Sequence, residues 1–326
     1  MNSLGRKFRI SIFGESHGQA LGVVMDGVPA GIELSQQDFE PDLDRRRSGA
    51  RGTTPRKESD TPHLVSGVFQ GRTTGAPLTV LFYNENTRSA DYRNLVDMPR
   101  PSHADMVAAV KFRGFNDYRG GGHFSGRVTL GIVAAGTVAK KIIDKVRISS
   151  RIVSIGNQTD SDKFQQVIDK AMSEGDSVGG VIECTASGCD AGWGEPFFDS
   201  VESVVSHLMF SIPGVKGVEF GSGFAGAALT GSQNNDPIVS PDGRTATNNA
   251  GGINGGITSG NDIVVRIAVK PTASISRPQQ TLNRATGKVE ELIIKGRHDS
   301  CIALRAGVVA EAALAIALAD FSLIAR

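Results

Sequence analysis

The order of hydrophobic and polar positions along the chain predicts a mixture of strands and helices. Segments in which apolar and polar residues alternate, or in which β-branched residues cluster, are typical of strands. The segment FRISIFG at 8–14 shows this alternation and runs directly into the small-residue loop GESHG. The other predicted strands lie at the start of 22–34, twice within 63–85, and at 147–157, 179–188, 215–224, 227–232 and 262–272.

Apolar residues at helical spacing predict several helices in the same chain. Gly175 is a stop signal near the end of the amphipathic segment 160–176. Another helix entry is expected at Ser35, because Asp38 stands three residues further on and completes a pattern like a capping box. The predicted helices are the short segment 106–112 and the longer segments 130–146, 160–176, 198–212 and 302–324.

Three long polar stretches separate these elements and are interpreted as loops. They cover residues 45–60, 86–127 and 233–262, and the second is interrupted by the short helix 106–112. No fixed-period repeat, charge block or Pro/Ser linker divides the chain. We therefore expect one α+β domain over residues 1–326, with mostly antiparallel strands and long functional loops.

Composition limits the kinds of partner to be expected. The 326 residues include 35 basic and 34 acidic side chains, and a formal net charge of +1 gives no general attraction to nucleic acid or to a membrane. The three cysteines form no CxxC pair, and there is no long apolar leader, so we expect a cytoplasmic protein. The apolar run 312–319 is too short to span a bilayer and is expected in a buried helix.

A basic cluster occupies residues 45–57, which contain six Arg or Lys and no acid. It could be a solvated loop, a clamp for phosphate and carboxylate groups, or a nucleic-acid patch. Guanidinium groups match both anions with paired hydrogen bonds, which favours the clamp. One Trp and three Tyr are few aromatic residues for base stacking, which weakens the third interpretation. The six residues are Arg45, Arg46, Arg47, Arg51, Arg56 and Lys57.

Four of the six histidines lie in loops rich in glycine, proline or small residues. Within RGGGHFSGR at 119–127, bare backbone amides close to Arg127 suggest an anion held against the main chain. Histidine is also the natural proton carrier near neutral pH. The histidine spacings match no metal-binding motif, so no metal is expected. The four histidines are His17, His103, His123 and His298.

Ten motifs occur in one order and together resemble the chorismate synthase family from end to end. They are GESHG, DLDRRRSGARGTTPRKESD, SGVFQGRTTGAPL, RPSHAD, RGGGHFSGRVT, GDSVGGVIE, SIPGVKGVEFGSGF, NNAGGINGGITSGNDI, KPTASI and GRHDSC. The resemblance implies a β-α-β sandwich fold and a homotetramer. It also implies the 1,4-elimination of phosphate from 5-enolpyruvylshikimate 3-phosphate to give chorismate, with reduced FMN required and no net redox change.

The same resemblance implies roles for individual residues. By that resemblance His17 serves the leaving phosphate, His103 protonates the reduced flavin, and Asp299 helps to remove the substrate proton. The residues implied to bind substrate or NADP are Arg46, Arg51 and Arg127. The residues implied to bind FMN are His123, Phe124, Ser125, Pro213, Gly214, Gly255, Lys270, Pro271, Thr272, Ala273, Ser274 and Arg297.

The chain departs from the family pattern beside the implied flavin site. The family commonly has Arg and Ser where this chain has His123 and Phe124, and Gly where it has Ser102. Because His123 replaces a fixed cation with a titratable one, we expect FMN binding to weaken as pH rises. Two other functions stay open: a flavin oxidoreductase that spends NADPH in each turnover, and a non-catalytic protein that binds anions or nucleic acid.

Overall fold

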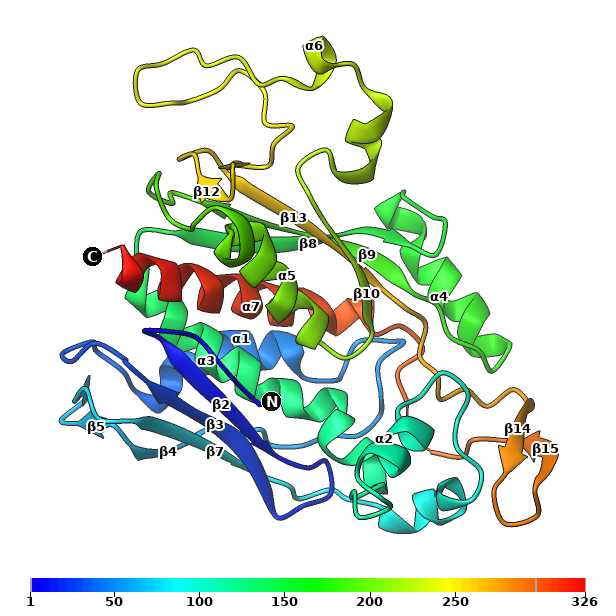
Figure 1. Cartoon of the computed structure of the whole chain (residues 1–326). Helices are drawn as coiled ribbons and strands as arrows, with labels where there is room; N and C mark the ends of the chain where they lie inside the picture. The colour runs from blue at the N-terminus through cyan, green and yellow to red at the C-terminus, as the bar shows by residue number, and fades with distance from the viewer. Residues whose placement is uncertain (1, 297, 326) are drawn as a thin grey trace.

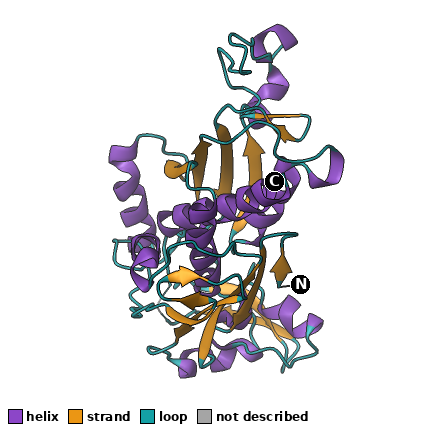
Figure 2. Cartoon of the chain, turned by 90° about the vertical axis from the view of Figure 1, so that its left-hand side faces the viewer, coloured by secondary structure: helices purple, strands orange, loops and turns teal. Residues whose placement is uncertain are grey.

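The computed structural model describes residues 2–296 and 298–325. Two antiparallel sheets lie on either side of a layer of helices, so the chain forms three layers in the order sheet, helices, sheet (Figure 1). Figure 2, turned by 90°, shows the same separation of the two sheets by helices. This is the arrangement that the resemblance implies.

Each sheet turns one face toward the helices. The first sheet has five strands in the order β1-β2-β3-β7-β4, and the second has four in the order β10-β13-β9-β8. Strand β9 shows the expected alternation, with every second residue buried, because only one face of the sheet contacts the core. The bounds are β1 (Ser3–Leu4), β2 (Arg9–Gly14), β3 (Ala20–Asp26), β4 (His63–Ser66), β7 (Leu78–Tyr83), β8 (Arg147–Ile155), β9 (Gly180–Ser187), β10 (Val215–Phe220) and β13 (Ile263–Val269).

Two long apolar helices, α3 (Thr129–Ile142) and α7 (Ala303–Ile324), form the centre of the molecule and pack against each other. Helix α3 contacts β2 and β3, whereas α7 contacts β8 and β9, so each helix is covered on several sides. Among the described residues, α7 alone is long and apolar enough to cross a membrane, and 83% of the qualifying window is buried inside the protein. The predicted buried helix around 312–319 is therefore confirmed.

The remaining helices and strands are shorter and lie around this core. Helix α5 contacts α7 and β10, and α1 contacts both α3 and α7. The bounds are α1 (Glu40–Arg46), α2 (Asp105–Lys111), α4 (Phe164–Ser173), α5 (Val201–Ser211) and α6 (Gly231–Asn234), with the small strands β5 (Val68–Phe69), β6 (Arg72–Thr73), β11 (Ile253–Asn254), β12 (Ile257–Thr258), β14 (Gln279–Asn283) and β15 (Lys288–Leu292).

A buried carboxylate joins the two ends of the chain. Asp320, near the end of α7, accepts hydrogen bonds from the backbone amides of Arg6, Lys7 and Phe8 at 2.9, 2.7 and 2.8 Å. A carboxylate with three amide donors is well compensated for its loss of water. These bonds fix the segment that leads into β2, and so they also fix the start of the GESHG loop that follows this strand.

Several local predictions are confirmed at the level of single bonds. The strand predicted at 8–14 is β2, and the helix predicted at 302–324 is α7. The expected cap is also present, because Asp38 Oδ2 accepts hydrogen bonds from the backbone amide and the hydroxyl of Ser35 at 2.7 and 3.0 Å.

Other local predictions are wrong. The strand predicted at 227–232 is instead the end of a 3₁₀-helix followed by α6, where Gln233 caps Thr230 as in a capping box. The loop predicted at 45–60 starts inside α1, whose last turn contains Arg45 and Arg46. At 230–234 the capping box outweighs the apolar residues that suggested a strand.

The hairpin of β14 and β15 was not predicted. Its sequences QQTLN and KVEEL show no clean alternation of apolar and polar residues, which is the signal on which the strand predictions relied. The hairpin lies over a small separate cluster of buried residues, Leu95, Leu292 and Ile294.

Helices α3 and α7 approach each other closely at Gly136. A Cβ atom at this position would lie 2.3 Å from Ala312 Cβ and 2.5 Å from Ala312 Cα. We predict that Gly136→Ala lowers the free energy of unfolding by about 1–3 kcal/mol, because overpacking outweighs the better helix propensity of alanine. Denaturant unfolding measures the change, and Gly231→Ala, where no atom lies within 4 Å of the added Cβ, is the matched control. Equal stability of Gly136→Ala and the parent protein would contradict the close packing.

Candidate active site

A cavity of about 980 Å³ is lined by residues of β2, α3, α5 and α7 and by several long loops. Its lining includes nine Arg or Lys residues and three Asp or Glu residues, so the cavity is strongly basic in a chain that is almost neutral. Such a local excess of positive charge attracts anions. The basic lining residues are Arg46, Arg47, Arg56, Lys57, Arg100, Arg127, Lys216, Lys270 and Arg305.

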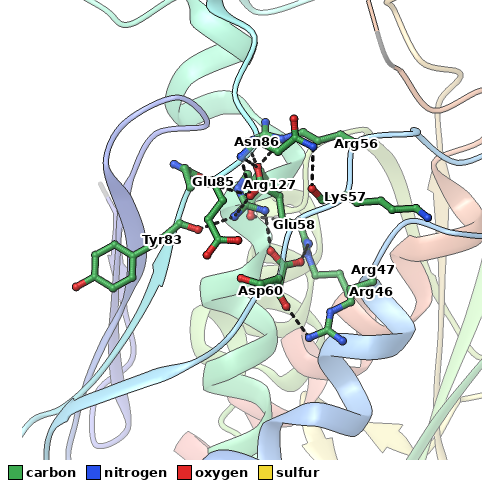
Figure 3. A network of polar contacts seen from close by, with 12 residues as sticks. Arg46, Arg47, Arg56, Lys57, Glu58, Asp60, Tyr83, Glu85, Asn86 and Arg127 are labelled. Carbon is green, nitrogen blue, oxygen red and sulfur yellow. Dashed lines mark hydrogen bonds and ion pairs between the residues drawn. The ribbon is translucent and has the colours of Figure 1, made fainter.

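Asp60 links two of these arginines, Arg46 and Arg127 (Figure 3). Its Oδ1 accepts a hydrogen bond from Arg127 Nη1 at 2.8 Å, and its Oδ2 lies 3.5 Å from Arg46 Nη1. All three side chains are buried. A buried carboxylate between two guanidinium groups offsets their charge repulsion, whereas removal of one partner would leave an uncompensated buried charge.

Glu58 forms the second centre of the same network. Its carboxylate accepts hydrogen bonds from Arg56 Nη2 at 2.6 Å and from the backbone amides of Glu85 and Asn86 at 2.9 and 3.2 Å. Burial alone would raise the pKa of Glu58, but the Glu85 amide and the charges of Arg127 and Arg56 hold it below its usual range. Glu58 is therefore ionised at neutral pH, and the network contains two carboxylates.

The guanidinium group of Arg46 donates its hydrogen bonds to other protein groups. Its Nε donates to Thr129 Oγ1 at 3.0 Å, and its Nη2 donates to the carbonyls of Gly126 and Arg127 at 2.9 and 3.2 Å. Burial lowers the pKa of Arg46 to about 9, which still leaves it charged at neutral pH. Arg46 thus shapes the turn that leads into α3 and contributes positive charge to the cavity.

The three consecutive glycines pass between two of the predicted catalytic histidines. Gly120, Gly121 and Gly122 all have positive φ, at 61°, 83° and 55°, which side chains other than glycine rarely adopt. A Cβ at Gly120 would lie 3.0 Å from His17 Nε2, and one at Gly121 would lie 3.5 Å from His103 Cε1. The RGGG sequence therefore allows backbone to occupy the narrow space between the two imidazole rings.

His17 lies just behind the wall of this cavity. It is buried, its Nδ1 is 3.3 Å from Ser89 Oγ, and its ring meets that of Tyr92 edge-on at 5.2 Å. The neighbouring residues Ser16 and Tyr92 line the cavity. Burial, with the positive charges of Arg56 and Arg119, lowers the pKa of His17 to about 4. His17 is consequently neutral at neutral pH when no anion is bound.

His103 lines the cavity beside a carboxylate that the sequence analysis did not select. Its Nδ1 lies 2.7 Å from Asp105 Oδ1. Asp105 also accepts two hydrogen bonds from the Arg100 guanidinium, both at 2.7 Å, and Arg100 donates in turn to Ser274 Oγ at 2.9 Å. Burial lowers the pKa of His103, while Asp105 acts in the opposite direction.

Asp299 reaches the same cavity from the segment before α7. Its Oδ1 accepts a hydrogen bond from the Thr54 backbone amide at 2.9 Å, and its Oδ2 accepts one from Arg305 Nη2 at 2.6 Å. Both carboxylate oxygens are therefore held, one by the basic loop and one by the first turn of α7.

The segment after β13 supplies polar groups to the same cavity. Lys270 donates from Nζ to the carbonyl of Ser102 at 2.5 Å, and Ser102 has a φ of 57°, a conformation that favours the glycine usual in the family. The hydroxyl of Thr272 is buried and finds no hydrogen-bond partner within residues 2–296 and 298–325. A buried donor facing a basic cavity fits the phosphate of a cofactor such as FMN.

Most of the other predicted residues also line this cavity. His123 holds the end of β2, since its Nδ1 is 2.7 Å from the carbonyl of Gly14, and its Nε2 is 3.2 Å from Asn2 Oδ1. The predicted residues found in the lining are Arg46, His103, His123, Phe124, Ser125, Arg127, Pro213, Gly214, Lys270, Thr272, Ala273, Ser274 and Asp299.

Of the predicted residues that the structure describes, four are absent from the cavity lining: His17, Arg51, Gly255 and Pro271. Arg51 is mostly exposed and its Nε pairs with Asp169 of α4 at 2.8 Å. Gly255 lies in the turn between β11 and β12, and Pro271 is absent from the described lining. Arg297 lies outside the described residues.

Sequence reasoning missed the acids that organise the site and several cationic residues that line it, Arg100, Lys216 and Arg305 among them. Glu58 and Asp60 follow the basic cluster in RKESD, Asp105 follows His103 in RPSHAD, and Arg305 follows Asp299 by six residues. The only available signal was that each stands close in sequence to a residue already selected. Among the described residues, no group of three His, Cys, Asp or Glu side chains could hold a metal ion.

Comparisons with known proteins agree with this geometry. A family model described as chorismate synthase matches residues 8–323. The chain belongs to the chorismate synthase family. It is 56% identical over 325 residues to the chorismate synthase of Chitinophaga pinensis, a match that covers 99% of this chain and 97% of that protein. It is 44% identical over 351 residues to the chorismate synthase of Dehalococcoides mccartyi, which covers 99% and 96% of the two chains.

A solved structure confirms the fold, and the family gives the class of enzyme. A crystal structure of chorismate synthase matches with a TM-score of 0.76 at 28% identity, covering 99% of this chain and 93% of that one. The predicted α+β sandwich is therefore confirmed. The enzyme is a lyase of the shikimate pathway that eliminates phosphate from 5-enolpyruvylshikimate 3-phosphate to form chorismate. Members of this family use reduced flavin.

The contact between Asp105 and His103 predicts the effect of a conservative substitution. Because Asp105 acts against the burial that lowers the pKa of His103, Asp105→Asn should lower that pKa further. An NMR titration of histidine ring signals in the unliganded protein measures the change. Asp117→Asn removes a carboxylate paired with Arg119 instead and should leave His103 unaffected. An unchanged or higher pKa for His103 in Asp105→Asn would contradict an electrostatic role for this contact.

Proposed function

We propose that the basic cavity binds 5-enolpyruvylshikimate 3-phosphate together with reduced FMN, and that His17, His103 and Asp299 carry out the proton transfers of the elimination. The observation that carries this proposal is the tri-glycine turn, which lies close to both His17 and His103 at the wall of a cavity whose described lining includes nine cationic residues. The substrate has one phosphate and two carboxylates, and FMN has another phosphate, so the charge of the cavity suits both ligands.

The arginines serve the substrate in two ways. Arg46 and Arg127 are held by Asp60 and supply fixed positive charge, which costs no rearrangement when the anion arrives. Arg51 pairs with Asp169 outside the cavity. It would contribute to substrate binding only if this ion pair broke and residues 48–56 moved.

His17 is the proposed proton donor to the leaving phosphate. In the unliganded protein it is neutral, since burial and two arginines lower its pKa to about 4. A phosphate dianion beside the ring adds negative charge where Arg56 and Arg119 now dominate, and so it raises the pKa. The substrate thereby brings His17 into the protonated form that phosphate departure requires.

Asp299 and His103 complete the proposed proton transfers. Asp299 accepts the ring proton of the substrate, the electrons of that C–H bond enter the new double-bond system, and phosphate leaves with the electrons of its C–O bond. Bound FMN would supply electron-rich reduced flavin chemistry without being consumed. His103, held beside Asp105, would be the proton donor toward that cofactor.

The FMN site that we propose combines the loop around His123 with the segment 270–274. The unpartnered Thr272 hydroxyl and the Ser274 hydroxyl, which already accepts from Arg100, are suitable for a ribityl phosphate or flavin oxygen. Gly255 lies outside this cavity, so its implied contact with FMN requires a second subunit. Arg297 belongs to the same proposed set.

The proposed assembly is a cytoplasmic homotetramer in which residues 1–326 act as one catalytic domain, without nucleic acid or membrane as a partner. Large exposed apolar side chains support subunit contacts, because single soluble chains rarely expose many of them. Phe197 and Phe198 are 85% and 92% exposed, and Phe224 is 82% exposed.

An anaerobic assay tests the proposed function. Purified protein is mixed with dithionite-reduced FMN and 5-enolpyruvylshikimate 3-phosphate, while chorismate absorbance and free phosphate are followed together. The proposal predicts equal amounts of both products, with the flavin still reduced at the end. Stoichiometric oxidation of flavin would indicate an oxidoreductase, and nucleic-acid binding without any flavin effect would indicate a binding protein.

The low pKa of His17 gives a second, independent prediction. An NMR titration of the unliganded protein should give a pKa of about 4, and adding inorganic phosphate should raise it. By linkage, phosphate should then bind more tightly as pH falls, because binding and protonation favour each other. His63 on β4 lies outside the cavity lining, and its signal is the control that should not respond. A pKa of His17 that is insensitive to phosphate would remove it as the phosphate's proton donor.

A further inference from the structure

Arg305 occupies the first turn of α7, next to the carboxylate that we propose as the base. Its Nη2 donates to Asp299 Oδ2 at 2.6 Å, and its Nη1 donates to the backbone carbonyl of Arg46 at 3.3 Å. The side chain is four-fifths buried and lines the active-site cavity. One guanidinium group therefore connects the buried helix α7, the end of α1 and the Asp299 carboxylate.

The hydrogen bonds around Asp299 restrict the carboxylate from both sides. The Thr54 amide binds Oδ1 at 2.9 Å and Arg305 binds Oδ2, so rotation of the carboxylate group would break at least one bond to a fixed donor. A charge-assisted bond of this kind is about twice as strong as one between neutral groups. The rate of proton abstraction depends on where the carboxylate is held, because a shift of about 1 Å at the reacting atoms can cost about 100-fold in rate.

The hydrogen bonds of Arg305 differ from those expected of a purely structural arginine. Its Nε is buried and has no hydrogen-bond partner in the described parts of the chain. An unsatisfied buried donor costs stability, so a residue with a purely structural task would be expected to use it. The guanidinium group is instead oriented so that it bonds to Asp299, while its Nε donor is left without a partner among the described residues.

We propose that Arg305 is a positioning residue of the elimination, which holds the Asp299 carboxylate in the orientation that accepts the ring proton of the substrate. This inference rests on the proposed role of Asp299. It assigns to Arg305 an effect on proton removal and not on the binding of substrate or flavin.

The test compares Arg305→Met and Arg305→Lys with the parent enzyme under the anaerobic assay. We expect Arg305→Met to lower kcat by about 100-fold while KM changes by less than about threefold, because positioning acts on the transition state. With substrate deuterated at the carbon that loses the proton, the isotope effect on kcat should increase in this variant. Arg305→Lys, which keeps a cation near Asp299, should recover part of kcat. FMN affinity, measured by quenching of flavin fluorescence, should be unchanged in both.

Two further variants make the result specific. Arg151→Met removes a neighbouring guanidinium that lines a small second pocket with Arg305 but pairs with Glu183, and it should behave like the parent. In an Asp299→Asn background, Arg305→Met should cause no additional loss of kcat, because the carboxylate that it positions is absent. Additive losses in the double variant would overturn the proposal.

Other outcomes are also decisive. A rise in KM with unchanged kcat in Arg305→Met would show that Arg305 binds substrate, and an unchanged isotope effect with a low kcat would show that it acts on another step. If Arg305→Met does not fold, the kcat and isotope effect of Arg305→Lys decide the question. Full activity of Asp299→Asn would reject the proposed base itself, and absence of chorismate with the parent enzyme would reject the proposed site, so these failures are distinct from a failure of Arg305.

Discussion

Two buried carboxylates, Glu58 and Asp60, hold in place the arginines that give the cavity its charge. Three guanidinium groups without these acids would repel one another in a region from which water is largely excluded. With them, Arg46, Arg56 and Arg127 form a network that is already assembled before any ligand arrives. The consequence for catalysis is a preorganised positive field, which stabilises a departing phosphate without the cost of moving charged side chains at that moment.

The second constraint is steric and concerns the tri-glycine turn. Side chains at Gly120 and Gly122 would clash with their neighbours, and the positive φ of all three glycines is a conformation that other residues rarely adopt. The turn thus lies close to two histidines with different surroundings, His103 in the cavity lining and His17 just behind the cavity wall. His17 sits among arginines and is neutral until an anion comes, whereas His103 has Asp105 beside it. These different surroundings support the two different proton transfers that we propose for the two imidazoles.

The sequence predicted what depends on local pattern and missed what depends on long-range pairing. The alternation at 8–14 and the apolar stretch at 302–324 were sufficient to predict β2 and α7, since their neighbours in space reinforce the local preference. The motifs predicted several of the loops that meet in the cavity, although the loop with Gly255 is not among them. The acids that pair with the arginines could not be predicted, because Asp60 and Arg127 are separated by 67 residues and only the fold brings them together. For the same reason Arg51 seemed equivalent to Arg46, although it points to Asp169 instead.

The central claim is that one preformed basic cavity binds both the flavin and the substrate. A crystal structure of the protein with oxidised FMN and 5-enolpyruvylshikimate 3-phosphate tests this claim most directly. The account predicts the FMN phosphate or ring against Thr272 and Ser274, the substrate phosphate beside His17, and Asp60 still bonded to Arg127. Either ligand bound outside this cavity, or an Arg127 that has left Asp60 to reach the substrate, would contradict it.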